Sequence, residues 1–290
     1  MGINLFIIAL TSALCFAMAL VLTQFGLRTI RPFTGAVIAL PITAVFFAAI
    51  FYQTAVWSDW DRESAATFAI VGLIFPVGIT LLTFFSNSLV GPNLTGALGN
   101  LTPFFAMTSA IFLLNETPNG TQLVGAVGVC IGVMLLFNGN LHVDKRLLYG
   151  ASGLPLAAAA LRGISQPLIK IGLIGWPSPV AAVTIGYITS SLAIGLFAFF
   201  RGEKALRLPL SGVAWFTATG LVNGLAVLLL YMALELGSVA VVSPLIACYP
   251  LFTLILNRIF FGDSGLSNLS VAGIGLTVFG ISLLLSSSMV

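Results

Sequence analysis

The feature that most constrains the fold is an apolar pattern that occurs twice. Residues 101–105 (Leu-Thr-Pro-Phe-Phe) begin an apolar stretch that ends at Asn115-Glu116, and residues 248–252 (Cys-Tyr-Pro-Leu-Phe) begin one that ends at Gly262-Asp263. A glycine-rich apolar segment follows each stretch. The pattern predicts two equivalent halves, residues 1–147 and 148–290.

The composition indicates that both halves lie in a membrane. Of the 290 residues, 59% are hydrophobic and only 7% are charged, whereas soluble domains carry about 25% charged residues. Apolar runs bounded by Pro, Gly, Asn or charged residues predict ten spans. These are residues 3–26, 33–53, 67–89, 94–114, 120–138, 148–174, 179–200, 212–236, 239–261 and 268–286. We expect an all-α integral membrane protein with ten transmembrane helices.

The loop charges predict the orientation of each half. The loops after the first, fifth and seventh spans carry Arg28, Arg31, Lys145, Arg146, Arg201, Lys204 and Arg207. On the opposite side Arg62 stands among Asp59, Asp61 and Glu63. Basic loops favour the cytoplasm, so we expect both termini outside. Equivalent loops differ in charge between the halves, which predicts two inverted five-helix repeats.

Several classes of function lack their sequence signals. The three cysteines lie in apolar segments without a paired spacing, which disfavours disulfides and metal sites. The sequence contains no GxxxxGK[ST] motif and no membrane-embedded Ser–His or paired-carboxylate arrangement. We therefore expect no enzymatic activity, no cofactor and no nucleic-acid partner.

Matched prolines and one polar helix stripe are the main candidates for a functional site. Pro103 and Pro250 stand at equivalent places near the middle of two spans. Each is expected to kink its helix and to free the carbonyl one turn earlier, at Gly99 or Ile246. Matched interruptions of this kind point to binding and gating. Arg162, Gln166 and Lys170 recur every four residues and so share one face of a helix. A cation deep in the bilayer should face a cavity or a partner.

Other polar residues inside the spans extend this candidate site. Glu235 is a possible counter-ion, most plausibly for Lys170, and also a possible proton-coupling group. The remaining candidates for substrate binding are Gln24, Asn100, Asn223, Tyr231 and Tyr249, with Gln24 as the repeat counterpart of Lys170. Each of them could equally bridge two helices.

Motifs in the second half are similar to those of a known family. Residues 230–235 (Leu-Tyr-Met-Ala-Leu-Glu), Ser243-Pro244, residues 249–252 and residues 261–263 (Phe-Gly-Asp) resemble the EamA family of the drug/metabolite transporter superfamily. The resemblance implies a small-metabolite carrier, often an exporter, in the inner or plasma membrane. Inverted repeats are also typical of secondary transporters. An amino acid or organic acid is the expected substrate, carried by alternating access.

Three alternatives remain at this stage. The superfamily also contains nucleotide-sugar and phosphorylated-sugar exchangers, which would use more than one deep cation. A channel or a non-transporting membrane receptor represents another class. The glycine pattern at Gly128 and Gly132 is typical of close helix packing, within a monomer or across a homodimer.

Overall fold

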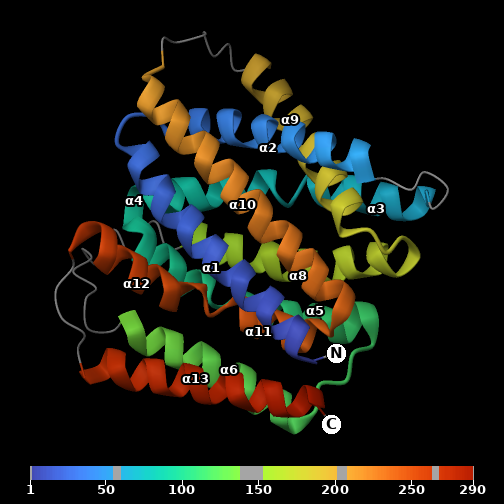
Figure 1. Cartoon of the computed structure of the whole chain (residues 1–290), viewed down its shortest axis with the longest axis vertical. Coiled ribbons are helices and arrows are strands. Elements are labelled where there is room, and N and C mark those ends of the chain that lie inside the picture. The colour runs from blue at the N-terminus through green and yellow to red at the C-terminus, as the bar shows by residue number, and fades with distance from the viewer. Residues whose placement is uncertain (1, 55–59, 138–152, 201–207, 263–267, 290) are drawn as a thin grey trace.

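The computed structural model describes residues 2–54, 60–137, 153–200, 208–262 and 268–289. The first half contains α1 (Gly2–Leu27), α2 (Pro32–Thr54), α3 (Arg62–Gly72), α4 (Val77–Gly99), α5 (Thr102–Leu114) and α6 (Gly120–Phe137). The second half contains α8 (Gly153–Gly175), α9 (Pro179–Phe200), α10 (Leu210–Leu236), α11 (Val239–Ile246), α12 (Tyr249–Phe261) and α13 (Asn268–Met289). Figure 1 shows these helices as one bundle with both termini at the same end.

The prediction of an all-helical membrane protein is confirmed. Within the described ranges, seven helical stretches are long and apolar enough to cross a bilayer. Each predicted span coincides with one helix or with parts of two consecutive helices. The start of the sixth predicted span, residues 148–152, lies outside the described residues.

The matched prolines mark helix breaks rather than the kinks that the sequence predicted. α4 ends at Gly99 and α5 begins at Thr102, while α11 ends at Ile246 and α12 begins at Tyr249. Pro103 and Pro250 therefore occupy the first turn of a new helix, where a missing N–H leaves no backbone bond unmade. The carbonyl of Gly99, expected to be freed, accepts a hydrogen bond from Thr102 Oγ1 at 2.7 Å.

Backbone conformation and helix packing identify which residues of the first half are equivalent to which residues of the second. α5 and α12 both end on a left-handed residue, Asn115 (φ 52°) and Gly262 (φ 68°), which are 147 positions apart. Gly26 on α1 lies against the ring of Phe216, and Gly172 on α8 lies against the ring of Phe68. Hence α1 maps onto α8 with a shift of 146 residues, and α3–α4 map onto α10 with a shift of 148.

Equivalent helices run in opposite directions. Along the α6–α13 contact, Gly125 lies against Gly280 and Leu284, whereas Gly132 lies against Gly273 and Thr277. Figure 1 shows this antiparallel pair along one side of the bundle. Because α6 and α13 are repeat equivalents, the second half is inverted relative to the first.

The two halves share one buried core. α1 packs along α10, and its equivalent α8 packs along α3 and α4. Each half therefore uses the other to bury its first helix, and the main cluster of buried apolar residues extends through both halves. This interleaving places α1, α4, α8 and α10 around the centre of the molecule.

Candidate transport site

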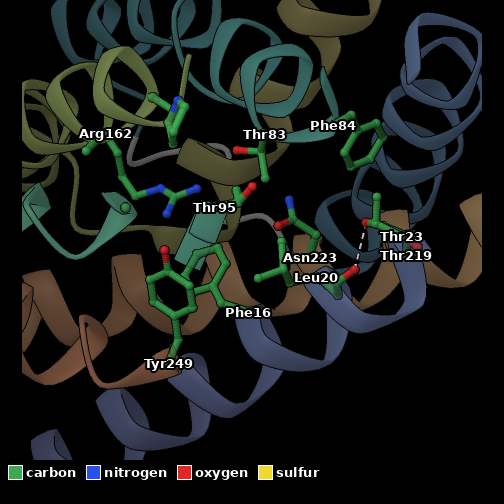
Figure 2. A pocket seen from close by; sticks show the side chains of 15 residues that line it. Phe16, Leu20, Thr23, Thr83, Phe84, Thr95, Arg162, Thr219, Asn223 and Tyr249 are labelled. Atoms are coloured by element: carbon green, nitrogen blue, oxygen red, sulfur yellow. Dashed lines mark hydrogen bonds between the residues drawn. The ribbon is translucent and has the colours of Figure 1, made fainter. Parts of the chain in front are cut away.

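A small cavity of about 40 Å³ lies between the central helices. Its walls come from α1, α4, α8 and α10, together with Tyr249 at the start of α12. Figure 2 shows the polar and aromatic side chains that face it. The cavity therefore takes its wall from both halves.

The cavity occupies one side of the bundle. We call the end where α1 meets α2, with Arg28 and Arg31, the basic face, and the end with both termini the terminal face. On α1 the lining runs from Phe16 to Thr23, in the half nearer the basic face. On α8, which starts at the basic face, it runs from Pro155 to Arg162. The space thus extends from mid-membrane toward the basic face.

Arg162 is the charged group of the cavity wall. Its guanidinium carbon lies 5.5 Å from the centre of the Phe16 ring and 6.0 Å from the centre of the Tyr249 ring. Its Nε is buried without a hydrogen-bond partner. Within the described part of the chain, Lys170 forms a salt bridge with Glu116, whereas Arg162 has no carboxylate partner. Arg162 is therefore a cation in contact with aromatic faces and without a counter-ion there.

The contact with Phe16 also locates the molecular centre. With the shift of 146 residues, Phe16 and Arg162 are repeat equivalents. Two equivalent residues can touch only at the pseudo-twofold axis that relates their halves. Arg162 therefore lies at the axis, where the two halves meet.

Hydroxyl and amide groups line the remainder of the wall. Asn223 Nδ2 donates to Tyr187 Oη at 3.0 Å, and Tyr249 Oη donates to the Gly96 carbonyl at 3.2 Å. The Thr219 hydroxyl is buried and has no partner among the described residues. Thr219 and Asn223 also line a smaller space of about 10 Å³ beside Tyr187. The wall therefore offers hydrogen bonds beside a single cation.

Only three of the eight predicted substrate-binding residues line this cavity: Arg162, Asn223 and Tyr249. Gln24 Nε2 donates to Asn257 Oδ1 at 3.2 Å, and Asn100 Nδ2 donates to the Cys130 carbonyl at 3.1 Å, so both bridge helices. Tyr231 is buried against Phe75. Gln166 is buried one turn beyond Arg162.

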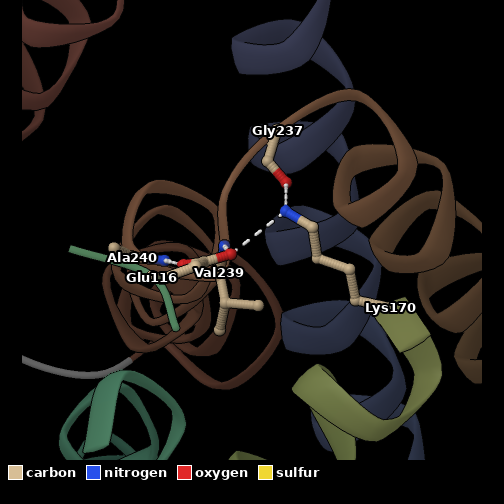
Figure 3. Close-up of polar contacts among 5 residues, drawn as sticks. All are labelled: Glu116, Lys170, Gly237, Val239 and Ala240. Atoms are coloured by element: carbon tan, nitrogen blue, oxygen red, sulfur yellow. Dashed lines mark hydrogen bonds and ion pairs between the residues drawn. The ribbon is translucent and has the colours of Figure 1, made fainter. Parts of the chain in front are cut away.

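The predicted Lys170–Glu235 pair is wrong. Lys170 Nζ lies 3.1 Å from Glu116 Oε1 and donates to the Gly237 carbonyl at 2.6 Å. Glu116 also accepts from the backbone N–H groups of Val239 and Ala240 at 3.0 and 3.2 Å. Figure 3 shows the Lys170 ammonium between the two oxygen acceptors. Glu235 is exposed, because it stands on a different side of α10 from the one packed against the core.

The family comparison identifies the fold that carries this cavity. The profile of the EamA-like transporter family matches residues 4–138 and 150–286. The chain belongs to this family. It is a multi-pass membrane protein of a transporter family, and a small-molecule substrate follows from that membership.

One solved structure supports the same architecture. It is described only as a crystal structure of a protein, and it aligns with a TM-score of 0.79 at 17% identity over 98% of this chain and 99% of the other. The likeness concerns the fold alone. No curated protein matches the sequence.

Sequence reasoning missed some residues of this EamA site for identifiable reasons. In the sequence, Glu116 only marks the end of an apolar stretch; in the structure it caps a helix of the other half, α11. The sequence does not distinguish Phe16 and Thr219 from the other residues of their apolar helices, because only the packed structure shows which side chains face the cavity. A repeat comparison could have found Phe16, since it is the equivalent of Arg162.

The described residues contain no group of three His, Cys, Asp or Glu side chains that could hold a metal ion. The cavity wall presents one guanidinium, three aromatic rings and several hydroxyl or amide groups to a ligand.

Proposed function

We propose that this protein is a secondary transporter that exports a small anionic metabolite, such as an amino acid or an organic acid, across the inner or plasma membrane by alternating access. The observation that supports this most strongly is Arg162, a cation on the molecular axis that faces the cavity without a carboxylate partner among the described residues. The Arg162 guanidinium needs a counter-charge, and the carboxylate of a substrate would supply it.

The physical chemistry of arginine supports an anionic ligand. A guanidinium carries its positive charge on a planar group that is more weakly hydrated than an ammonium. Its planar donors match a carboxylate in two parallel hydrogen bonds. The rings of Phe16 and Tyr249 hold the guanidinium in place, which lowers the entropy lost when the substrate binds.

The cavity favours a small carboxylate over a phosphorylated sugar. A phosphoryl group would favour a second cation, yet Lys170 is neutralised by Glu116. The structure therefore favours the phosphorylated-sugar exchanger less than the sequence did.

The inverted halves support alternating access. Inverted repeats can exchange conformations around a central site, and Arg162 lies where the halves meet. A channel or a receptor is the remaining alternative. Saturable flux that an opposing substrate accelerates would distinguish a carrier from both.

The experiment that tests the proposal is thermal stabilisation of the purified protein against a panel of metabolites. Amino acids, organic acids, phosphorylated sugars, nucleosides and hydrophobic cations would be compared on the native protein, Arg162→Ala, Arg162→Lys and the exposed control Arg258→Ala. Ligand at a hundredfold excess over its dissociation constant stabilises by about 2.7 kcal/mol.

We expect carboxylates to stabilise the native protein and Arg258→Ala equally, Arg162→Lys more weakly, and Arg162→Ala not at all. If stabilisation is confined to neutral or cationic compounds and survives Arg162→Ala, Arg162 is structural and the anion proposal is wrong.

A further inference from the structure

Gln166 is an unexplained polar group inside the bundle. Its side chain is 2% exposed, and neither its amide nitrogen nor its amide oxygen has a hydrogen-bond partner. An unpaired buried amide is costly, and it is more costly in a membrane interior. Gln166 lies one turn from Arg162 on the same stripe of α8, yet it does not line the present cavity.

The repeat relation shows where Gln166 belongs. The shift of 146 residues maps Gln166 onto Leu20, which lines the cavity. The shift of 148 maps Tyr231 onto Thr83, which also lines it. Gln166 and Tyr231 are thus the equivalents of residues that line the cavity in the other half.

We propose that the substrate has a second binding position, in a cavity that opens toward the terminal face and has Gln166 and Tyr231 in its wall. This rests on the proposed transport function and on exchange of conformation between the inverted halves. Arg162 serves both positions because it lies on the axis. A carboxylate can then stay on Arg162, while the hydrogen-bonding groups around it change from Thr83 and its neighbours to Gln166 and Tyr231.

The terminal face is closed in this structure by the Glu116–Lys170 latch, which we define as Glu116, Lys170 and the N–H groups of Val239 and Ala240. All eight residues of α11 are buried beneath it. The latch joins the end of α5 in the first half to α8 and α11 in the second. It must separate before the halves can open on this face.

The two faces are not closed by equal contacts. The equivalent of Lys170 is Gln24, a neutral group that donates to Asn257 at 3.2 Å. The equivalent of Glu116, Asp263, lies outside the described residues. A carboxylate binds an ammonium group more strongly than a neutral amide, and Gln24 stands where the first contact has Lys170, so the latch favours the state that is closed at the terminal face.

A matched pair of cysteines tests the second cavity. Ala159 and its equivalent Ala13 are both fully buried, at 0% exposure, but Ala159 lies in the wall of the present cavity, where a longer side chain would point into the space, and Ala13 does not. Ala159→Cys and Ala13→Cys would be reacted with a small water-soluble thiol reagent in lipid nanodiscs, where both faces are accessible. The native cysteines, of which Cys130 and Cys248 are buried, set the background rate.

We expect Ala159→Cys to react at least about tenfold faster than Ala13→Cys when the latch is intact. Glu116→Gln, or Lys170→Gln as a second variant, should raise the rate at Ala13→Cys about tenfold and lower it at Ala159→Cys; a tenfold change corresponds to about 1.4 kcal/mol. Unchanged rates at Ala13→Cys in both latch variants would overturn the inference.

Gln166→Leu, which installs the residue found at the equivalent position, tests the ligand role separately. We expect carboxylate stabilisation of the resting protein to remain and carrier flux to fall about tenfold, the effect of one lost hydrogen bond of roughly 1.4 kcal/mol. If Gln166→Leu transports at the native rate, the second binding position is overturned, whereas the proposed function is unaffected. Absence of any carboxylate binding or flux in the native protein would instead contradict the proposed function.

Discussion

Glu116 accepts three hydrogen bonds from the second half of the chain, two from backbone N–H groups and one from Lys170. The side chains of Lys170 and Glu116 are 19% and 14% exposed. The pair is therefore largely withdrawn from water, and each charge depends on the other. Removal of one partner leaves a mostly buried charge without compensation.

This dependence predicts a non-additive thermal stability. Lys170→Met and Glu116→Gln should each lower the unfolding temperature of the purified protein, because each leaves a polar group unpaired. The double variant should lose less than the sum of the two, with a coupling of about 0.5–3 kcal/mol. Strictly additive effects would show that the two side chains contribute independently and that the contact is not a latch.

The residues of the site were predictable where chemistry alone decided them. Arg162 could be placed in a cavity from its charge and its depth, and Asn223 and Tyr249 from their polarity at mid-span. The partner of Lys170 was not predictable, because depth along one helix does not give the side of the neighbouring helix. Glu235 is at a suitable depth but lies on an exposed side of its helix, whereas Glu116 reaches Lys170 from the first half of the chain.

At the scale of elements, the α6–α13 pair depends on glycine. A Cβ added at Gly132 would lie 2.5 Å from Thr277 Oγ1 and 2.8 Å from the Gly273 carbonyl. A Cβ added at Gly275, on the partner helix, would meet nothing within 4 Å. The glycine faces that could have served a dimer are therefore used within one chain.

We accordingly expect Gly132→Ala to destabilise the purified protein by about 1–3 kcal/mol, the usual cost of overpacking, because the helices must move apart. Gly275→Ala is the matched control and should be neutral or slightly stabilising, since alanine is the better helix former by about 1 kcal/mol. Thermal unfolding in detergent measures both. Equal behaviour of the two variants would contradict the close contact.

The helix breaks show the limit of prediction for elements. The matched prolines correctly located an interruption in each of two spans, since proline cannot continue a helix without losing a hydrogen bond. They did not reveal that the chain starts a new helix there with proline in its first turn. That outcome depends on local groups such as Thr102, whose hydroxyl satisfies the Gly99 carbonyl.

At the scale of the whole molecule, the position of the cavity and the asymmetry of the loop charges together indicate a direction of transport. The cavity extends toward the basic face, and the latch closes the terminal face. The positive-inside rule favours the basic face as cytoplasmic. Under that orientation the resting protein receives substrate from the cytoplasm, as an exporter does.

This orientation predicts the side from which a large, impermeant thiol reagent reaches two engineered cysteines. Ala158→Cys lines the cavity, and Tyr52→Cys is exposed at the end of α2 on the terminal face. We expect intact cells to label Tyr52→Cys only and everted vesicles to label Ala158→Cys only, because the bilayer separates the faces. The opposite pattern would place the basic face outside, so that the same cavity would receive external substrate and the protein would act as an importer. Arg162 would then select an anion for uptake, with its chemistry unchanged and only the direction of transport reversed.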